Sequence, residues 1–198
     1  NLGRLGFLSS ISKDEIIPAI DDIFNNNYRL DKRTLLRLTT KNNLFGELNY
    51  ALNDLAINRK DSTTLVVIHV YVDDVFLNSY WADGLIVTTP TGSTAYSLSN
   101  GGPIVTPGSE NFVITPIAPH NLTIRPIVIS DKSKIRIRIA GRDEQFLVSL
   151  DSRSVIIDSF TELLIEKEDF KINLVQIINK TFFSTIRDKL KWGLDIRN

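Results

Sequence analysis

Apolar residues near the start of the chain follow the spacing of a helix. They recur at intervals of three and four from Ile16 to Phe24, and Ser12 and Glu15 before them resemble a capping box. Pro18 is compatible with this helix if it falls in the first turn, where backbone N–H groups need no helical partner. The run of asparagines at 25–27 ends the pattern. The sequence therefore predicts one amphipathic helix here.

A second helical pattern lies near the end of the chain. Phe182, Ile186 and Leu190 share one face, and basic residues follow in the last turn, where they complement the helix dipole. Gly193 comes just beyond and supplies the left-handed conformation that often ends a helix. We therefore expect a C-terminal helix.

The long middle section has the texture of a β protein. Short runs of β-branched and aromatic residues alternate with Gly, Pro, Asn and Asp, and they predict about ten strands. The pattern from Lys134 to Ile139 alternates strictly, whereas Leu65 to Val70 is apolar on both faces and is the better candidate for a central strand. The predicted fold is mainly β (α+β overall), with a multi-stranded β-sandwich. The predicted strands are Leu35–Thr39, Tyr50–Asn58, Leu65–Val72, Val75–Tyr80, Leu85–Thr88, Phe112–Ile117, Ile127–Ser130, Lys134–Ala140, Phe146–Leu150, Ser154–Ile157 and Glu162–Glu166.

Composition excludes several classes of protein. With 42% hydrophobic and 23% charged residues, the chain can bury a core and does not resemble a disordered protein. Lys plus Arg and Asp plus Glu number 23 each, and no long basic run is present, so we expect no nucleic-acid partner.

Cysteine and methionine are both absent from the 198 residues. Without cysteine there is no disulfide, thiolate metal site or cysteine nucleophile, which fits a reducing compartment, and we expect a cytoplasmic protein. The longest apolar stretch is far shorter than the ~20 residues of a membrane helix, so we expect no membrane partner. Because the first residues read like the middle of a domain, we also expect the chain to begin inside a larger protein.

Small and hydroxylated residues are concentrated in one stretch, DGLIVTTPTGSTAYSLSNGGP, from Asp83 to Pro103. Glycine permits tight turns and close approach to a ligand, and hydroxyl and backbone N–H groups can bind ribose or phosphate oxygens. The same composition also suits a long connection with tight turns, so the residues by themselves leave both interpretations open.

This stretch resembles the signature of the NAD kinase family. Further blocks of the same family occur in the family's order over nearly the whole chain, and their combined order and spacing are specific. These blocks are Asn1–Leu8, Ala51–Leu55, Pro116–Leu122 and Phe182–Gly193.

The resemblance implies both an architecture and a reaction. Residues 1–27 would be the tail of an N-terminal α/β domain, and residues 28–198 the NAD-binding β-sandwich with a C-terminal helix that returns to the first domain. The family transfers a phosphoryl group from ATP, or in some members polyphosphate, to the 2′-hydroxyl of the adenosine ribose of NAD. Mg²⁺ accompanies the ATP, and homotetramers or homodimers prevail.

The catalytic base of the family is the Asp of a Gly-Gly-Asp-Gly-Thr motif, and no Gly-Gly-Asp occurs in these residues. The resemblance places this motif before Asn1. We therefore expect no catalytic residue in this chain and no NADP formation by the 198 residues alone.

Ten residues match NAD-binding positions of the family. The departures are Asp54, which is one methylene shorter than the more common Glu, and Arg153, which stands where relatives often have Gln. Asp83 matches a residue that reaches a dinucleotide across a subunit contact. The ten are Asn53, Asp54, Asp83, Thr94, Ala95, Tyr96, Ser97, Ser99, Ala118 and Arg153.

Other residues have structural interpretations, and two other functions stay open. We expect His69 and His120 to be structural, so no transition-metal site is predicted, and Tyr80-Trp81 to be either a core pair or an anchor of a subunit contact. The alternatives to an NAD kinase are a non-catalytic dinucleotide-binding and oligomerisation module, and a relative of the lipid kinases.

Overall fold

The computed structural model describes residues 7–8, 11–60, 66–140, 145–178 and 181–191. The chain divides into two compact units, one formed by residues 1–33 with 173–198 and the other by residues 34–172. The sequence-based division into residues 1–27 and 28–198 stays a prediction.

The first unit contains the N-terminal helix that the sequence predicts. A short 3₁₀ turn, η1 (Lys13–Glu15), leads into α1 (Ile16–Phe24). The Glu15 carboxylate accepts a hydrogen bond from the Ser12 backbone N–H at 2.8 Å, as in a capping box, and a second one from the Ser12 hydroxyl at 2.8 Å. Pro18 falls in the first turn of α1 and therefore breaks no hydrogen bond of the helix.

The C-terminal helix, α3 (Phe182–Leu190), belongs to the same unit. Thr181 begins it, and its hydroxyl oxygen accepts the Ser184 N–H at 3.1 Å. Lys191 adopts the left-handed conformation with φ of 54° directly after the helix. The predicted stop residue, Gly193, lies outside the described residues.

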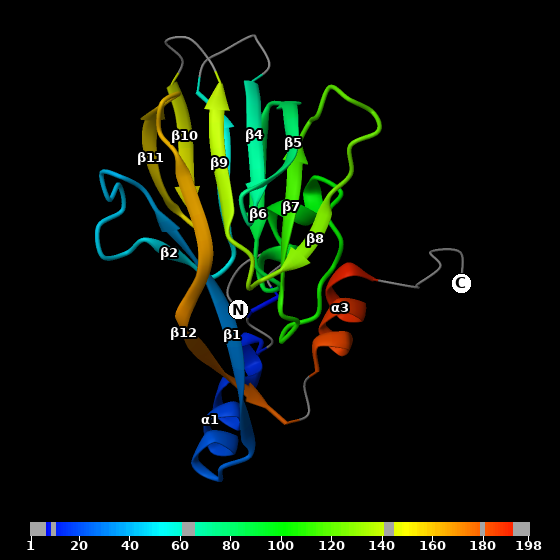
Figure 1. Ribbon diagram of the computed structural model, residues 1–198. Helices are drawn as coiled ribbons and strands as arrows, with labels where there is room; N and C mark the ends of the chain where they lie inside the picture. Colours follow the sequence, from blue (N-terminus) through cyan, green and yellow to red (C-terminus); the bar gives the residue numbers. More distant parts are fainter. Residues whose placement is uncertain (1–6, 9–10, 61–65, 141–144, 179–180, 192–198) are drawn as a thin grey trace, which may run out of the picture. The chain divides into compact units, whose positions relative to one another are not determined.

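The strands of the described residues form two six-stranded sheets (Figure 1). The order of the first is β2-β1-β12-β9-β4-β5 and that of the second is β11-β10-β3-β6-β7-β8. All eleven predicted runs contain strand, so the mainly β class is confirmed. The strands are β1 (Tyr28–Thr39), β2 (Tyr50–Ala51), β3 (Asp54–Arg59), β4 (Val66–Val72), β5 (Val75–Ala82), β6 (Gly84–Thr88), β7 (Asn111–Ile117), β8 (Ile127–Ser130), β9 (Ile135–Ala140), β10 (Gln145–Leu150), β11 (Arg153–Asp158) and β12 (Leu163–Ile177).

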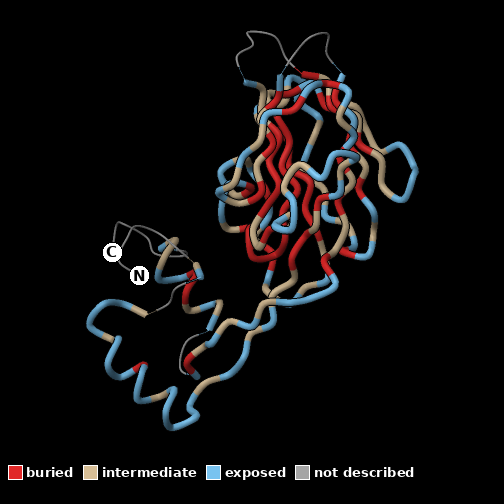
Figure 2. The backbone as a smooth tube through the Cα atoms, turned by 90° about the vertical axis from the view of Figure 1, so that its left-hand side faces the viewer, coloured by how far each residue is buried: buried red, intermediate tan, exposed pale blue. Residues whose placement is uncertain are grey.

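The two sheets of residues 34–172 enclose the core. Figure 2 shows that the buried residues, drawn in red, are concentrated in the strands, and among the described residues Phe112 and Phe146 are the largest fully buried side chains. β4 lies one strand from the edge of its sheet, and only its core-facing side is fully buried, so it is not the central strand that its composition suggests. β6 is buried at all five positions. It lies in the middle of the second sheet, with the connection after it packed on the outer face.

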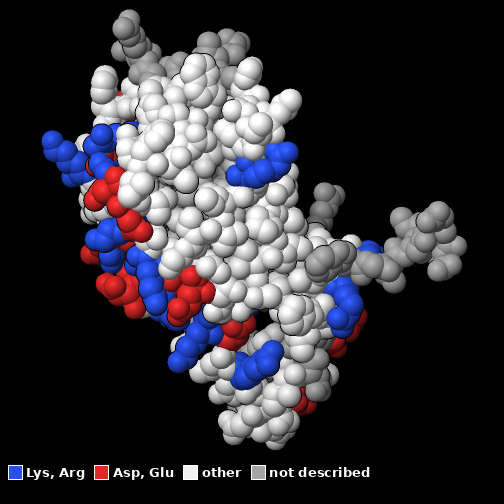
Figure 3. Space-filling model, turned by 45° about the vertical axis from the view of Figure 1, so that its right-hand side comes forward, with Lys and Arg blue, Asp and Glu red and all other residues white. Residues whose placement is uncertain are grey.

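The outer face of the first sheet carries the alternating charges of β9. Two arginines of β9, Arg136 and Arg138, form ion pairs with Glu162. Arg136 also donates a hydrogen bond to Asp74 at 2.5 Å. Figure 3 shows acidic and basic side chains alternating along one side of the molecule, with few charges elsewhere in this view. The charges neutralise one another locally, so they form no basic patch.

Candidate functional site

The predicted site is built around a bend that interrupts the predicted strand 50–58. Leu52 and Asn53 separate β2 from β3, and they leave the sheet just before Asp54. The carboxylate of Asp151, which lies 98 residues beyond Asn53, accepts the N–H groups of residues 52, 53 and 54 at 2.9, 2.8 and 3.2 Å. The Asp151 N–H in turn donates to the Asp54 carbonyl at 3.0 Å.

The hydroxylated stretch packs against the other side of this bend. The Asn53 carbonyl accepts the Thr88 hydroxyl and the Thr89 N–H, each at 2.9 Å, and the Thr89 hydroxyl donates to the Leu52 carbonyl at 2.6 Å. Gly92 lies so close that a Cβ there would be 2.3 Å from the Asn53 carbonyl oxygen. The backbone of the bend is therefore held from two sides, while the Asn53 amide side chain makes no hydrogen bond to any described residue.

Asp54 carries a buried carboxylate. Its exposed fraction is 8%, and burial, helped by the negative charge of Asp151, raises its pKa to about 6. The ionised form is therefore poorly solvated and would gain from a ligand that donates hydrogen bonds, such as a sugar hydroxyl.

The stretch after β6 continues as two short helical turns, η2 (Gly92–Thr94) and α2 (Tyr96–Ser99). Tyr96 is 41% exposed, and its hydroxyl donates to Asn58 Oδ1 at 3.4 Å. Ser97 points the other way: it is fully buried and pairs with the Thr115 hydroxyl at 2.8 Å. Ala95 and Ser99 are exposed, and Thr94 is half-buried. Ser97 thus anchors α2 to β7, whereas its neighbours face outward.

Asp83 and Ala118 lie together at the far end of β3. Arg59, the last residue of β3, forms an ion pair with Asp83 at 3.2 Å, and the Asp83 N–H donates to the Ile117 carbonyl at 2.9 Å. Ala118 follows directly, is exposed and has a φ of 44°. From Asp54 to Arg59 the strand spans about 17 Å at ~3.3 Å per residue, so Asp54 and Asp83 lie near opposite ends of β3.

Arg153 does not point freely into solvent. Its guanidinium donates hydrogen bonds to the Leu48 and Tyr50 carbonyls and lies 5.8 Å from the centre of the Tyr50 ring. The sequence analysis named Arg153 in this turn and did not predict the role of Asp151, two residues before it. The signal available was an Asp between two strand patterns, in a turn that requires positive φ.

Of the residues for which a structural role was predicted, His69 has a hydrogen-bond partner, Tyr80 and Trp81 do not form a core pair, and the role of the His120 side chain stays a prediction. His69 Nδ1 is 2.7 Å from the Ser79 hydroxyl on the neighbouring strand, and the His120 N–H donates to the Trp81 carbonyl at 2.8 Å. Tyr80 is 3% exposed and Trp81 is 56% exposed, so the first is core and the second is surface. Trp81, His120 and Leu122 line a shallow open hollow.

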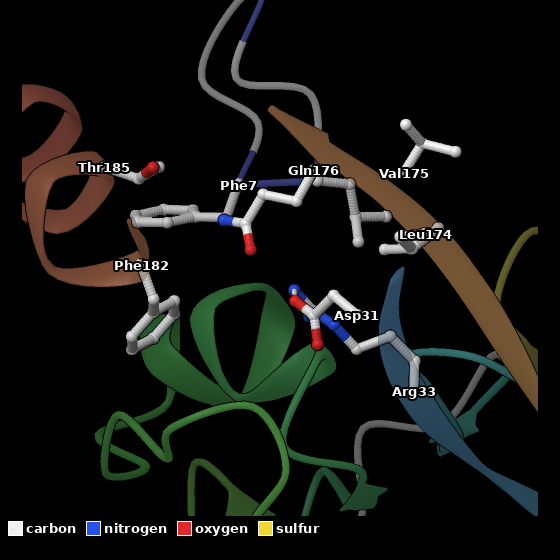
Figure 4. A pocket seen from close by; sticks show the side chains of 9 residues that line it. Phe7, Asp31, Arg33, Leu174, Val175, Gln176, Phe182 and Thr185 are labelled. Carbon is white, nitrogen blue, oxygen red and sulfur yellow. Dashed lines mark hydrogen bonds and ion pairs between the residues drawn. The ribbon is translucent and has the colours of Figure 1, made fainter. Parts of the chain in front are cut away.

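Within the described part of the chain, no three possible ligands among His, Cys, Asp and Glu come together. Over the same residues, no helix has the length and apolar character needed to cross a membrane. The first unit holds a small cavity of about 30 Å³, room for about one water, beside the ion pair of Arg33 and Asp31 (Figure 4).

Comparison with known proteins gives a consistent result. Residues 52–177 match the family model of the ATP-NAD kinase C-terminal domain. The chain is 51% identical to the NAD kinase of Cytophaga hutchinsonii and 52% identical to that of Flavobacterium johnsoniae. Each alignment covers the whole of this chain and 68% of the relative's length.

Solved structures agree with these matches. The crystal structure of yeast NADH kinase complexed with NADH has a TM-score of 0.86 and 31% identity, over 99% of this chain and 58% of that one. An NAD kinase from Archaeoglobus fulgidus in complex with ATP has a TM-score of 0.77 and 28% identity, over 96% of this chain and 72% of that one. These relatives support the NAD kinase interpretation over the module and lipid kinase alternatives, and the chain belongs to the ATP-NAD kinase family.

Proposed function

We propose that this protein transfers the terminal phosphoryl group of ATP, or of polyphosphate, to the 2′-hydroxyl of the adenosine ribose of NAD. The ribose oxygen forms a bond to phosphorus as the phosphoanhydride bond breaks, so NADP and ADP leave when ATP is the donor. The hydroxyl proton passes to a base, which we place outside these 198 residues because they contain no Gly-Gly-Asp sequence.

The observation that carries this proposal is the pair Asn53 and Asp54 on a bend held from both sides. The Asn53 amide offers a donor and an acceptor to an adenine edge, and the Asp54 carboxylate offers acceptors to ribose hydroxyls. Tyr96 presents a partly exposed ring to the same ligand. The other residues proposed to line the NAD site are Asp83, Thr94, Ala95, Ser97, Ser99 and Ala118, with Ser97 acting through its bond to Thr115.

Three further features belong to the proposal. Mg²⁺ would be bound through the phosphates of ATP. Trp81 and Leu122, which are 56% and 86% exposed, support assembly into a homodimer or homotetramer. The lack of cysteine supports a cytoplasmic location.

The function is tested by NADP formation from NAD, ATP and Mg²⁺, followed with an NADP-specific dehydrogenase. The protein as its gene encodes it should produce NADP, and replacing Asn53 with Ala should raise the KM for NAD. A chain limited to the 198 residues, with a verified mass of 22.3 kDa, should produce none. NADP from that chain would contradict the placement of the base.

Tyr96 separates a stacking role from a hydrogen-bonding role. We expect Tyr96→Phe to leave the KM for NAD within about twofold, because its bond to Asn58 is long at 3.4 Å and the ring is retained. Tyr96→Ala should raise that KM by about tenfold, the effect of losing one aromatic contact worth about 1 kcal/mol or slightly more. Steady-state kinetics against NAD measure both, and equal KM values for the two variants would exclude stacking.

A further inference from the structure

The turn between β10 and β11 contacts the chain that enters β3 in two complementary ways. Asp151 accepts three consecutive N–H groups, from Leu52 to Asp54. Arg153 donates to two carbonyls a few residues earlier, those of Leu48 and Tyr50. One turn therefore binds the N–H groups of residues 52–54 through a carboxylate, and the carbonyl groups of Leu48 and Tyr50 through a guanidinium.

The three N–H groups need such a partner. Leu52 and Asn53 lie in the bend between β2 and β3 and have no place in the ladder of either sheet. They are half-buried, and an unpaired buried N–H is costly. Bonds from N–H groups to a charged acceptor are among the stronger hydrogen bonds in proteins. Asp151 is thus the group that fixes the backbone of the bend.

We propose that Asp151 is a positioning residue for NAD, because its carboxylate sets the backbone from which the Asn53 and Asp54 side chains reach the dinucleotide. Arg153 has the same kind of role and positions the loop before the bend instead of contacting NAD. This inference rests on the proposed function, which assigns NAD to Asn53 and Asp54. It goes beyond that function because it assigns the orientation of the Asn53 and Asp54 side chains to a hairpin turn about 100 residues later in the chain.

The negative charge of Asp151 should also affect the pH dependence of NAD binding, which a purely packing role would leave unchanged. The polar groups packed against Asp54 are Thr88 from β6, which is uncharged, and Asp151 from the β10–β11 turn, while the guanidinium of Arg153 lies on the Leu48 and Tyr50 carbonyls. Binding of NAD to an ionised Asp54 should strengthen as the pH rises through about 6. Removing the negative charge of Asp151 should move this midpoint to lower pH.

The test compares Asp151→Asn with Asp158→Asn in the protein as its gene encodes it. Asn tolerates the left-handed φ of 52° at position 151, so the variant should fold, but its amide group places a donor against the N–H groups. Asp158 lies at the other end of β11 and bonds to Phe160 and Thr161, so its variant loses the same charge outside the site.

For Asp151→Asn we expect the KM for NAD to rise by about tenfold or more, with the KM for ATP unchanged. The pH midpoint of NAD binding should fall, and hydrogen exchange of the amides from Leu52 to Asp54 should accelerate. Asp158→Asn should match the wild type in all these measurements. Asp151→Ala should have a larger effect on the KM for NAD than Asp151→Asn, provided that its thermal unfolding shows a folded protein.

An unchanged KM for NAD and an unchanged pH midpoint in folded Asp151→Asn would overturn the proposal. An equal change in the KM values for NAD and ATP would also overturn it, since that result indicates a general structural role. If the wild type formed no NADP and bound no NAD, the proposed function would fail, and the NAD-positioning role would fail with it. Faster amide exchange in Asp151→Asn would then show that the backbone contacts are real although the function is wrong.

Discussion

Replacing Gly92 with Ala should lower the free energy of unfolding by about 3 to 5 kcal/mol and abolish measurable NAD binding. A Cβ at this position would lie 2.3 Å from the Asn53 carbonyl oxygen and 2.4 Å from Thr88 Oγ1. The first of these is a backbone atom in a bend held from both sides, so it has no rotamer by which to move away. The bend must shift, and the two hydrogen bonds that end on that oxygen are lost with it.

Gly108→Ala is the matched control. Its Cβ would meet no atom within 4 Å, and its φ of 84° should cost the variant about 1 kcal/mol of backbone strain without touching the bend. Denaturant unfolding and NAD titration calorimetry measure the two properties. A Gly92→Ala protein as stable as Gly108→Ala, with the NAD affinity of the wild type, would show that the close contact between Gly92 and the Asn53 carbonyl is not needed for NAD binding.

Replacing Asp54 with Asn should make the protein more stable at neutral pH and not at acidic pH. The pKa of Asp54 is raised to about 6 in the folded state from 3.8, so the unfolded chain loses this proton first as the pH rises. Well below pH 3.8 the residue is protonated in both states and carries no penalty. Between pH 4 and 6 the wild type therefore loses stability, by about 3 kcal/mol once the pH is well above 6.

The variant removes this titration, so its advantage over the wild type should grow from about zero at pH 4 to about 3 kcal/mol at pH 7.5. It should bind NAD weakly at both values, because a neutral amide replaces the carboxylate that we propose accepts hydrogen bonds from the ribose hydroxyls. Urea unfolding at the two pH values measures the stability, and the exposed Glu47→Gln is the control. An advantage that is the same at pH 4 and pH 7.5 would contradict the buried, ionised carboxylate.

Local patterns predicted the two longer helices and the eleven runs that contain strand, but not the short helical turns η2 and α2. The helix from Ile16 to Phe24 and the alternation of β9 follow from the spacing of apolar residues, because each period places those residues on one buried face. The two longest strands were underestimated: β1 begins at Tyr28 and β12 continues to Ile177, through polar stretches that lack such a face.

Some features of the candidate site can likewise be predicted from local sequence, and others cannot. The hydroxylated stretch after Asp83 and the pair Asn53-Asp54 are visible in the sequence, since Gly and hydroxyl groups at that density are unusual for a core. The inward direction of Ser97 is not visible, because its partner Thr115 lies on another strand. Likewise, Arg153 reads as a residue available to a ligand until the carbonyls that it contacts are placed beside it.

The sequence by itself predicted the two longer helices, most of the strands, the family and the residues proposed to bind a dinucleotide. The tertiary structure decided that the predicted strand 50–58 bends at Asn53 and that a carboxylate from Asp151 holds the bend. The physical reason is that periodicity reports which face of a segment is buried, whereas the partner of a backbone N–H that leaves a sheet can come from anywhere in the chain. Here it comes from a hairpin turn 98 residues away.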